Sequence, residues 1–201
     1  IPLERVPERF VYFPLHMQPE MTTDIMGGAW ANQITTLRSL RSFVPADIPI
    51  VIKENPKKTG LMRSRLFWQR LAAIPNLLMT HDSVGSLELV KRAMLTATIT
   101  GTAGWEALRF GRPALAFGHV FWSGLPGAFR MGEATWEDVE RYRFDAEVFA
   151  QAIDTIGRIA SWGITDRDYI PIVPDYDPAR NALQVAQSFR ERLKTMGVKA
   201  D

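Results

Sequence analysis

Short apolar runs recur along the chain, and each is followed by a segment in which apolar residues return every three or four positions. The runs are rich in valine, isoleucine, leucine and phenylalanine and show little alternation with polar residues. That pattern is typical of strands that are covered on both sides. We therefore expect five buried strands, over residues 9–14, 50–53, 76–80, 95–99 and 114–117.

The segments between and after these runs have the spacing of amphipathic helices. They predict helices over residues 30–43, 63–73, 86–92 and 105–110, and three more after the last strand, over residues 136–142, 145–162 and 179–196. Pro178 suits the first turn of the last helix, because a helix start leaves the N–H that proline lacks unpaired. Strands that alternate with helices predict one α/β domain over residues 1–201. Its core would be a doubly wound, mostly parallel Rossmann-like sheet with helices on both faces and extra C-terminal helices.

Polar residues follow the predicted strands at the points where the strands end. They are His16, Gln18 and Glu20 after the first strand, Lys53, Glu54 and Asn55 at the end of the second, and Ser83 after the third. The carboxyl ends of parallel strands share one edge of the sheet, and open α/β sheets bind their ligands there. We therefore expect these side chains to gather around one site.

Most of these residues also have an ordinary structural explanation. His16 and Glu20 could act as acid, base or substrate anchors, or His16 could bond a loop carbonyl while Glu20 is only solvated. Lys53 could meet a phosphate, or it could end its strand in solvent. Ser83 could contact a base or phosphate, or it could cap the helix that follows.

The fourth strand leads into a loop of small residues and then into a helix. The loop consists of Thr100, Gly101, Thr102, Ala103 and Gly104. Small residues let a ligand approach the backbone, and N–H groups at a helix start attract phosphate. Glu106 in the first helical turn could accept two hydroxyls of a ribose. The alternative is that Thr102 caps the helix and Glu106 complements its dipole.

The chain becomes aromatic after Gly118. Phe121 and Trp122 lie in a segment that also contains glycine and proline, which predicts a loop. The two rings could stack on a sugar or a base, or they could pack locally over the sheet edge.

Composition excludes several classes of protein. The 24 lysine and arginine residues nearly balance the 22 acidic ones and form no block, so no nucleic-acid partner is expected. Cysteine is absent and only three histidines occur, which argues against disulfides and against a metal site. No apolar run is long enough to cross a bilayer. Because the chain begins with isoleucine, we expect it to be a piece of a longer protein.

Four motifs together resemble the capsule polysaccharide biosynthesis proteins. They are FPLHMQPE at 13–20, IKENP at 52–56, ITGTAGWEAL at 99–108 and GRPALAFG at 111–118. That family resembles the GT-B glycosyltransferases, including enzymes that move Kdo from CMP-Kdo. The resemblance covers the first two-thirds of the chain.

The resemblance implies that the chain is the C-terminal, nucleotide-sugar-binding half of a two-domain enzyme. An N-terminal domain and a glycan or glycolipid acceptor would be its partners, and a nucleotide sugar would be a substrate, with no further cofactor. The loop at 100–104 would hold the donor phosphate, Glu106 the ribose, and the turn at 53–56 would lie beside the phosphate or base. His16, Gln18 and Glu20 would face the cleft between the domains. The location would be the cytoplasm or the inner face of the membrane.

One departure from the family pattern weakens this analogy. The second motif commonly reads Lys-Glu-His-Pro in the family, and Asn55 takes the position of the histidine. Asparagine can donate a hydrogen bond to phosphate, but it carries neither a proton for transfer nor a positive charge. A non-catalytic carbohydrate- or partner-binding module with a degenerate nucleotide site is therefore an alternative. A relative of nucleotide-sugar epimerases is a third.

Overall fold

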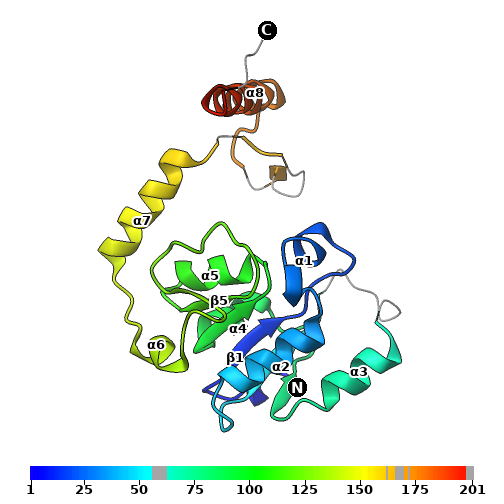
Figure 1. Cartoon of the computed structure of the whole chain (residues 1–201). Coiled ribbons are helices and arrows are strands. Elements are labelled where there is room, and N and C mark those ends of the chain that lie inside the picture. Colours follow the sequence, from blue (N-terminus) through cyan, green and yellow to red (C-terminus); the bar gives the residue numbers. More distant parts are fainter. Residues whose placement is uncertain (56–62, 162, 166–169, 172, 198–201) are drawn as a thin grey trace. The chain divides into compact units, whose positions relative to one another are not determined.

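A computed structural model of the chain describes residues 1–55, 63–161, 163–165, 170–171 and 173–197. Pro56 and Trp162, which end a motif and an expected helix, lie outside the described residues. The chain divides into two compact units, residues 1–152 and 153–201. The first unit contains the whole sheet (Figure 1).

A six-stranded sheet with the order β3-β2-β1-β4-β5-β6 forms the first unit, and every neighbouring pair is parallel. Its strands are β1 (Val11–Pro14), β2 (Ile50–Lys53), β3 (Leu77–Met79), β4 (Leu95–Thr98), β5 (Ala114–Ala116) and β6 (Ala128–Arg130). The doubly wound Rossmann-like fold that the alternation predicts is therefore confirmed. Strand β6 was not predicted, because its residues, Ala-Phe-Arg, form no apolar run and directly follow a segment rich in glycine and proline.

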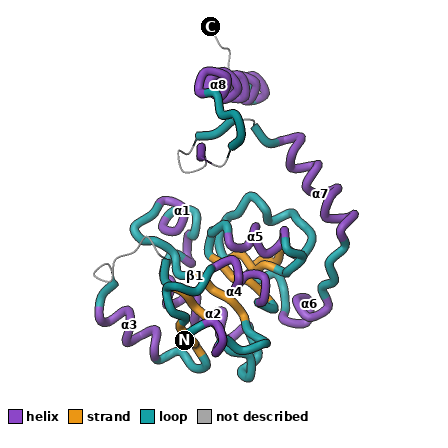
Figure 2. Tube along the Cα trace, turned by 180° about the vertical axis from the view of Figure 1, so that it is seen from behind, coloured by secondary structure: helices purple, strands orange, loops and turns teal. Residues whose placement is uncertain are grey.

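Helices cover both faces of the sheet (Figures 1 and 2). Helices α2 (Gln33–Phe43) and α3 (Arg65–Ala72) lie on one face, and α4 (Ser86–Arg92) and α5 (Ala103–Arg109) lie on the other. The remaining elements of this unit are η1 (Leu3–Arg5), α1 (Met21–Asp24), η2 (Gly28–Trp30), α6 (Trp136–Arg141) and the first half of α7 (Ala146–Ile159).

Side chains alternate between the two faces of the buried strands. Phe13 and Ile52 join the apolar core beneath α2, together with Leu37 of that helix. Tyr12 and Lys53, their neighbours along the strands, point to the opposite face, and both are buried. This second face therefore carries polar groups toward the carboxyl edge of the sheet.

Two helix starts differ from the sequence prediction. The expected helix at 30–43 is interrupted, because the Asn32 side chain caps α2 by accepting from the N–H groups of Ile34 and Thr35. Helix α5 begins at Ala103, so Gly104 lies inside the helix and not in the preceding loop. Its lack of a side chain has a packing cause, because a Cβ there would lie 2.3 Å from the Trp122 ring.

The second unit contains α8 (Pro178–Thr195), which begins with proline as expected. Asp177 caps this helix by accepting from the N–H groups of Ala179 and Arg180. Asn181 exchanges two hydrogen bonds with the backbone of Ile164, at 2.7 and 3.0 Å. These bonds hold the segment before α8 against the helix.

Candidate functional site

A pocket lies where the strand order of the sheet reverses, between β1 and β4. Loops that leave these two strands diverge to opposite sides, and doubly wound folds bind ligands in the resulting crevice. The pocket has a volume of about 290 Å³. Its lining includes His16 and Glu20 after β1, Asn55 after β2, and Thr100, Gly101, Thr102 and Ala103 after β4. Seven of the predicted site residues therefore meet in one place.

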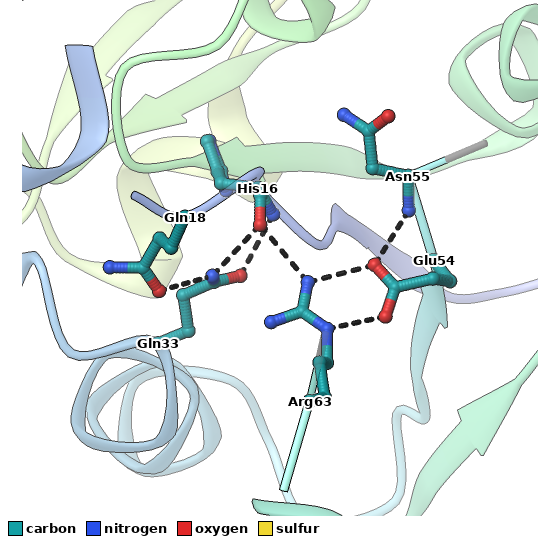
Figure 3. A network of polar contacts seen from close by, with 6 residues as sticks. All are labelled: His16, Gln18, Gln33, Glu54, Asn55 and Arg63. Atoms are coloured by element: carbon teal, nitrogen blue, oxygen red, sulfur yellow. Dashed lines mark hydrogen bonds and ion pairs between the residues drawn. The ribbon is translucent and has the colours of Figure 1, made fainter. Parts of the chain in front are cut away.

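Gln33 of α2 holds the backbone of the loop that follows β1 (Figure 3). Its amide oxygen accepts from the N–H of His16 at 2.8 Å, and its amide nitrogen donates to the carbonyl of His16 at 3.0 Å. The same nitrogen donates to the Gln18 side chain at 2.6 Å. Gln33 is buried, so this pair of bonds replaces water at the backbone of residue 16.

Arg63 ties the loop after β1 to the loop after β2. Its guanidinium forms an ion pair with both oxygens of Glu54 and donates to the carbonyl of His16 at 3.0 Å. Glu54 also accepts from the N–H of Asn55 at 2.8 Å. The Glu54 carboxylate is thus engaged within the protein, while the Asn55 side chain points away from the ion pair (Figure 3).

The His16 imidazole is buried and neutral. Burial, and secondarily the Arg63 charge, lower the pKa of His16 to about 4. Its Nε2 lies 2.8 Å from the Thr98 hydroxyl, which also accepts from the N–H of Gly101 at 2.9 Å. The Thr98 hydroxyl therefore contacts both the His16 ring and the first residues of the loop after β4. Among the described residues, Nδ1 has no hydrogen-bond partner.

Gln18 and Glu20 are both organised by Asp24. Gln18 donates to Asp24 at 2.6 Å and to the carbonyl of Ala31 at 2.9 Å, and the backbone N–H of Glu20 donates to Asp24 at 2.7 Å. The amide of Gln18 therefore serves the loop itself. Glu20 keeps an exposed side chain at the pocket.

The small-residue loop after β4 is fixed from two sides. Thr100 donates its hydroxyl to the carbonyl of Thr22 at 2.9 Å. Trp122 is fully buried and packs on Gly104, so local packing describes this ring and stacking on a ligand does not. Thr102 occupies the N-cap position of α5, but its side chain makes no capping hydrogen bond, which contradicts the capping alternative.

Six predicted residues lie outside the pocket lining, namely Gln18, Glu54 and Gly104, described above, and Lys53, Ser83 and Glu106. Lys53 is only 5% exposed, contrary to the solvated alternative, and its ammonium donates to Ser86 at 3.2 Å. Ser83 bonds to His81 at 2.8 Å and does not cap α4, which follows Gly85. Burial raises the pKa of the Glu106 carboxyl, and nearby Arg109 partly opposes this shift.

A phenol with a perturbed pKa lies on the same face of the sheet. Burial raises the pKa of Tyr12 to about 12; the Ser86 hydroxyl opposes this shift, while the Glu106 charge adds to it. Tyr12 therefore lies within electrostatic range of both groups. The polar face beneath α4 and α5 is built from Tyr12, Lys53, Ser86 and Glu106.

No sequence pattern indicated Gln33, Arg63 or Thr98 as parts of the site. Their positions are typical of ordinary structural residues. Gln33 lies at the start of an amphipathic helix, Arg63 precedes another helix, and Thr98 lies in a strand. Only Thr98 lies next to a recognised loop. The other two reach the site through long side chains from distant positions in the chain.

The parallel sheet and its strand order define a Rossmann-like α/β domain. The chain belongs to the capsule polysaccharide biosynthesis protein family, whose model matches residues 6–156. This finding confirms the family that the four motifs indicate. A search of curated proteins found no significant match.

Solved structures share this fold. The KpsC β-Kdo 2,7 transferase of Thermosulfurimonas dismutans matches with a TM-score of 0.52 and 18% identity, over 72% of this chain and 43% of that one. The KpsC β-Kdo 2,4 transferase of the same organism matches with a TM-score of 0.46 and 16% identity, over 73% of this chain and 45% of that one. The UDP-GlcNAc 2-epimerase of Methanocaldococcus jannaschii matches with a TM-score of 0.49 and 14% identity, over 77% of this chain and 47% of that one. The chain thus spans less than half the length of each.

The described part of the chain offers neither a membrane-spanning helix nor a cluster of metal ligands. None of the helices in this part of the chain is both long and apolar enough to span a bilayer. The same residues contain no group of three or more His, Cys, Asp or Glu side chains that could hold a metal ion.

Proposed function

We propose that this chain is the donor-binding half of a GT-B glycosyltransferase for capsule or surface polysaccharide. It would bind a nucleotide-activated sugar, CMP-Kdo or another, for transfer to a glycan or lipid acceptor. The observation that carries the proposal is the pocket at the sheet reversal, where loops from β1, β2 and β4 converge. Family membership and the fold shared with a Kdo transferase support it.

The pocket offers hydrogen-bond groups for a donor phosphate and sugar. Thr102 and Ala103 bring the start of α5 to the pocket, and a helix start presents unpaired N–H groups. Asn55 can donate to a phosphate oxygen from the opposite loop. Glu20 is the exposed carboxylate in this lining, so it is the group placed to serve as a base.

His16 does not compensate for the missing histidine at position 55. Although the two residues line the same pocket, the lowered pKa of His16 keeps its ring neutral at pH 7. His16 can therefore shape the wall of the pocket, but it supplies no positive charge to a leaving phosphate. Stabilisation of that charge would come from hydrogen bonds and from the protein field.

Calorimetric titration with CMP, CDP, UDP and GDP at fixed salt tests this proposal. We expect saturable binding of one nucleotide, and a loss of roughly 10- to 150-fold in affinity for Glu106→Ala, since removing a charged hydrogen-bonding partner costs roughly 1.5–3 kcal/mol. Glu140→Ala, an exposed glutamate of α6, is the matched control. Unchanged affinity in Glu106→Ala would refute its ribose role.

Asn55 favours one alternative, a non-catalytic carbohydrate- or partner-binding module with a degenerate nucleotide site. In that case a folded sample would bind none of the four nucleotides. Circular dichroism of the same sample establishes folding, and titration of the longer parent protein separates a degenerate site from one that needs both halves.

A further inference from the structure

The connection between β1 and β2 continues beyond the strands into the loops that follow them. The N–H of Leu15, the first residue after β1, donates to the carbonyl of Lys53 at 2.8 Å. One residue further along, the link is made by the Arg63 side chain, whose Nη2 donates to the His16 carbonyl at 3.0 Å and to Glu54 at 2.8 Å. Arg63 therefore joins the two loops at the point where they leave the sheet.

The Arg63 side chain is itself held in place. It directly precedes Ser64, which caps α3 by accepting from the N–H of Phe67 at 3.1 Å. The Phe67 ring centroid lies 4.5 Å from the Arg63 Cζ, a distance at which an aromatic face attracts a cation. The side chain of Arg63 is only 5% exposed. Helix α3 thus gives the guanidinium a fixed support.

The residues that Arg63 connects belong to the pocket, although Arg63 does not. Neither Arg63 nor Glu54 is part of the pocket lining, whereas the lining does include His16 and Asn55. The Glu54 carboxylate accepts from the N–H of Asn55 at 2.8 Å. A continuous path of hydrogen bonds therefore connects one lining loop to the other through the ion pair (Figure 3).

We propose that Arg63 is a positioning residue, which sets the separation of the loops after β1 and β2 and thereby the affinity of the pocket for a nucleotide. The inference rests on the proposed donor-binding function, because a nucleotide is the ligand that would contact both loops. Binding is tighter when the contacting groups already stand in the bound geometry, since less free energy is then lost in ordering them. A residue that holds these groups can therefore change affinity without touching the ligand.

Calorimetric titration of the double variant Arg63→Met/Glu54→Gln, with the nucleotide that binds the wild type, tests this role. The double variant removes the bond to the His16 carbonyl but leaves no buried charge without its partner, so it separates affinity from stability. We expect its Kd to rise about tenfold, the scale of one hydrogen bond to a charged group. In urea it should unfold at a higher concentration than Arg63→Met.

Arg41→Met is the matched control. Arg41 also holds a loop by donating to backbone carbonyls, those of Val44 and Ile48, each at 2.9 Å. That loop precedes β2 and so lies at the end of the strand opposite the pocket. The variant should lose stability but keep the wild-type Kd.

A measurement without ligand tests the same role. NMR relaxation should give a lower order parameter for the Asn55 amide in Arg63→Met/Glu54→Gln than in the wild type, because its partner at position 54 is no longer held by Arg63. The order parameter of residue 16 should stay the same, since Gln33 binds both backbone groups of that residue.

An unchanged Kd in the double variant, or an equal rise in Arg41→Met, would overturn the positioning role and leave the donor-binding proposal intact. If none of the four nucleotides binds the folded wild type, the donor-binding proposal fails instead. The order parameter of Asn55 then decides the role of Arg63: a lower value in the double variant supports it, and an unchanged value overturns it.

Discussion

Replacing His16 by glutamine should make the stability of this protein less sensitive to acid. Burial lowers the pKa of the folded-state imidazole to about 4, whereas an unfolded histidine titrates near 6.5. Between these two values the unfolded chain takes up a proton that the folded protein excludes. The free energy of unfolding is therefore unaffected above pH 6.5 and falls as the pH drops toward 4.

The size of this effect follows from the two pKa values. A difference between 6.5 and about 4 corresponds to roughly 3 kcal/mol at the acidic end of the window. That is a large share of the ~5–15 kcal/mol that stabilises a typical domain. Carboxylates also titrate in this range, but they are common to wild type and variant, so their contribution cancels in the comparison.

Urea unfolding at pH 7 and pH 4.5 measures the difference. We expect the wild type to lose about 2.5 kcal/mol more than His16→Gln between these two conditions. His119→Gln, a change at an exposed histidine, should lose as much as the wild type.

Equal acid sensitivity of wild type and His16→Gln would refute the reasoning. A direct measurement remains available if the variant does not fold. NMR titration of the wild-type His16 ring should give a midpoint near 4, and a midpoint above about 6 would show that the ring is not excluded from protonation.

Two further predictions concern the supports of the pocket. Arg63→Met should destabilise the protein by about 3 kcal/mol in urea unfolding, because it leaves the largely buried Glu54 carboxylate without its partner. Adding Glu54→Gln should recover part of this loss. If the double variant recovers nothing, the ion-pair explanation is contradicted. Gly104→Ala should lower the melting temperature by the equivalent of about 1–3 kcal/mol, because its Cβ would clash with Trp122. Gly157→Ala in α7, where a Cβ meets no atom within 4 Å, should instead stabilise that helix by about 0.5–1 kcal/mol, and a loss there would count against the clash explanation for Gly104.

Sequence patterns predicted the elements of the sheet but not their neighbours. The five expected strands are all present, since continuous apolar runs report burial on both sides. The place of β1 beside β4, which creates the pocket, depends on long-range pairing that no local period encodes. Strand β6 escaped prediction because it contains no apolar run and directly follows a segment rich in glycine and proline.

At the site, the sequence indicated the loops better than the use of their side chains. Strand-end logic located His16, Asn55 and the residues after β4, because parallel strands bring their carboxyl ends to one edge. It could not show that Glu54 is engaged by Arg63, because that contact depends on the path of the chain between them. Whether a polar side chain faces a ligand or a neighbouring side chain depends on which residues the folded chain brings next to it.

The two hydrogen bonds from Gln33 to the backbone of residue 16 set the course of the loop without using the side chain at that position. Because the amide of Gln33 binds the N–H and the carbonyl of that residue, the loop path needs no contribution from the imidazole. The backbone at position 16 is thus set separately from its side chain, which is buried against Thr98. A change of the acid–base chemistry at position 16 therefore has to fit the space beside Thr98, but it need not alter the backbone contacts that set the course of the loop.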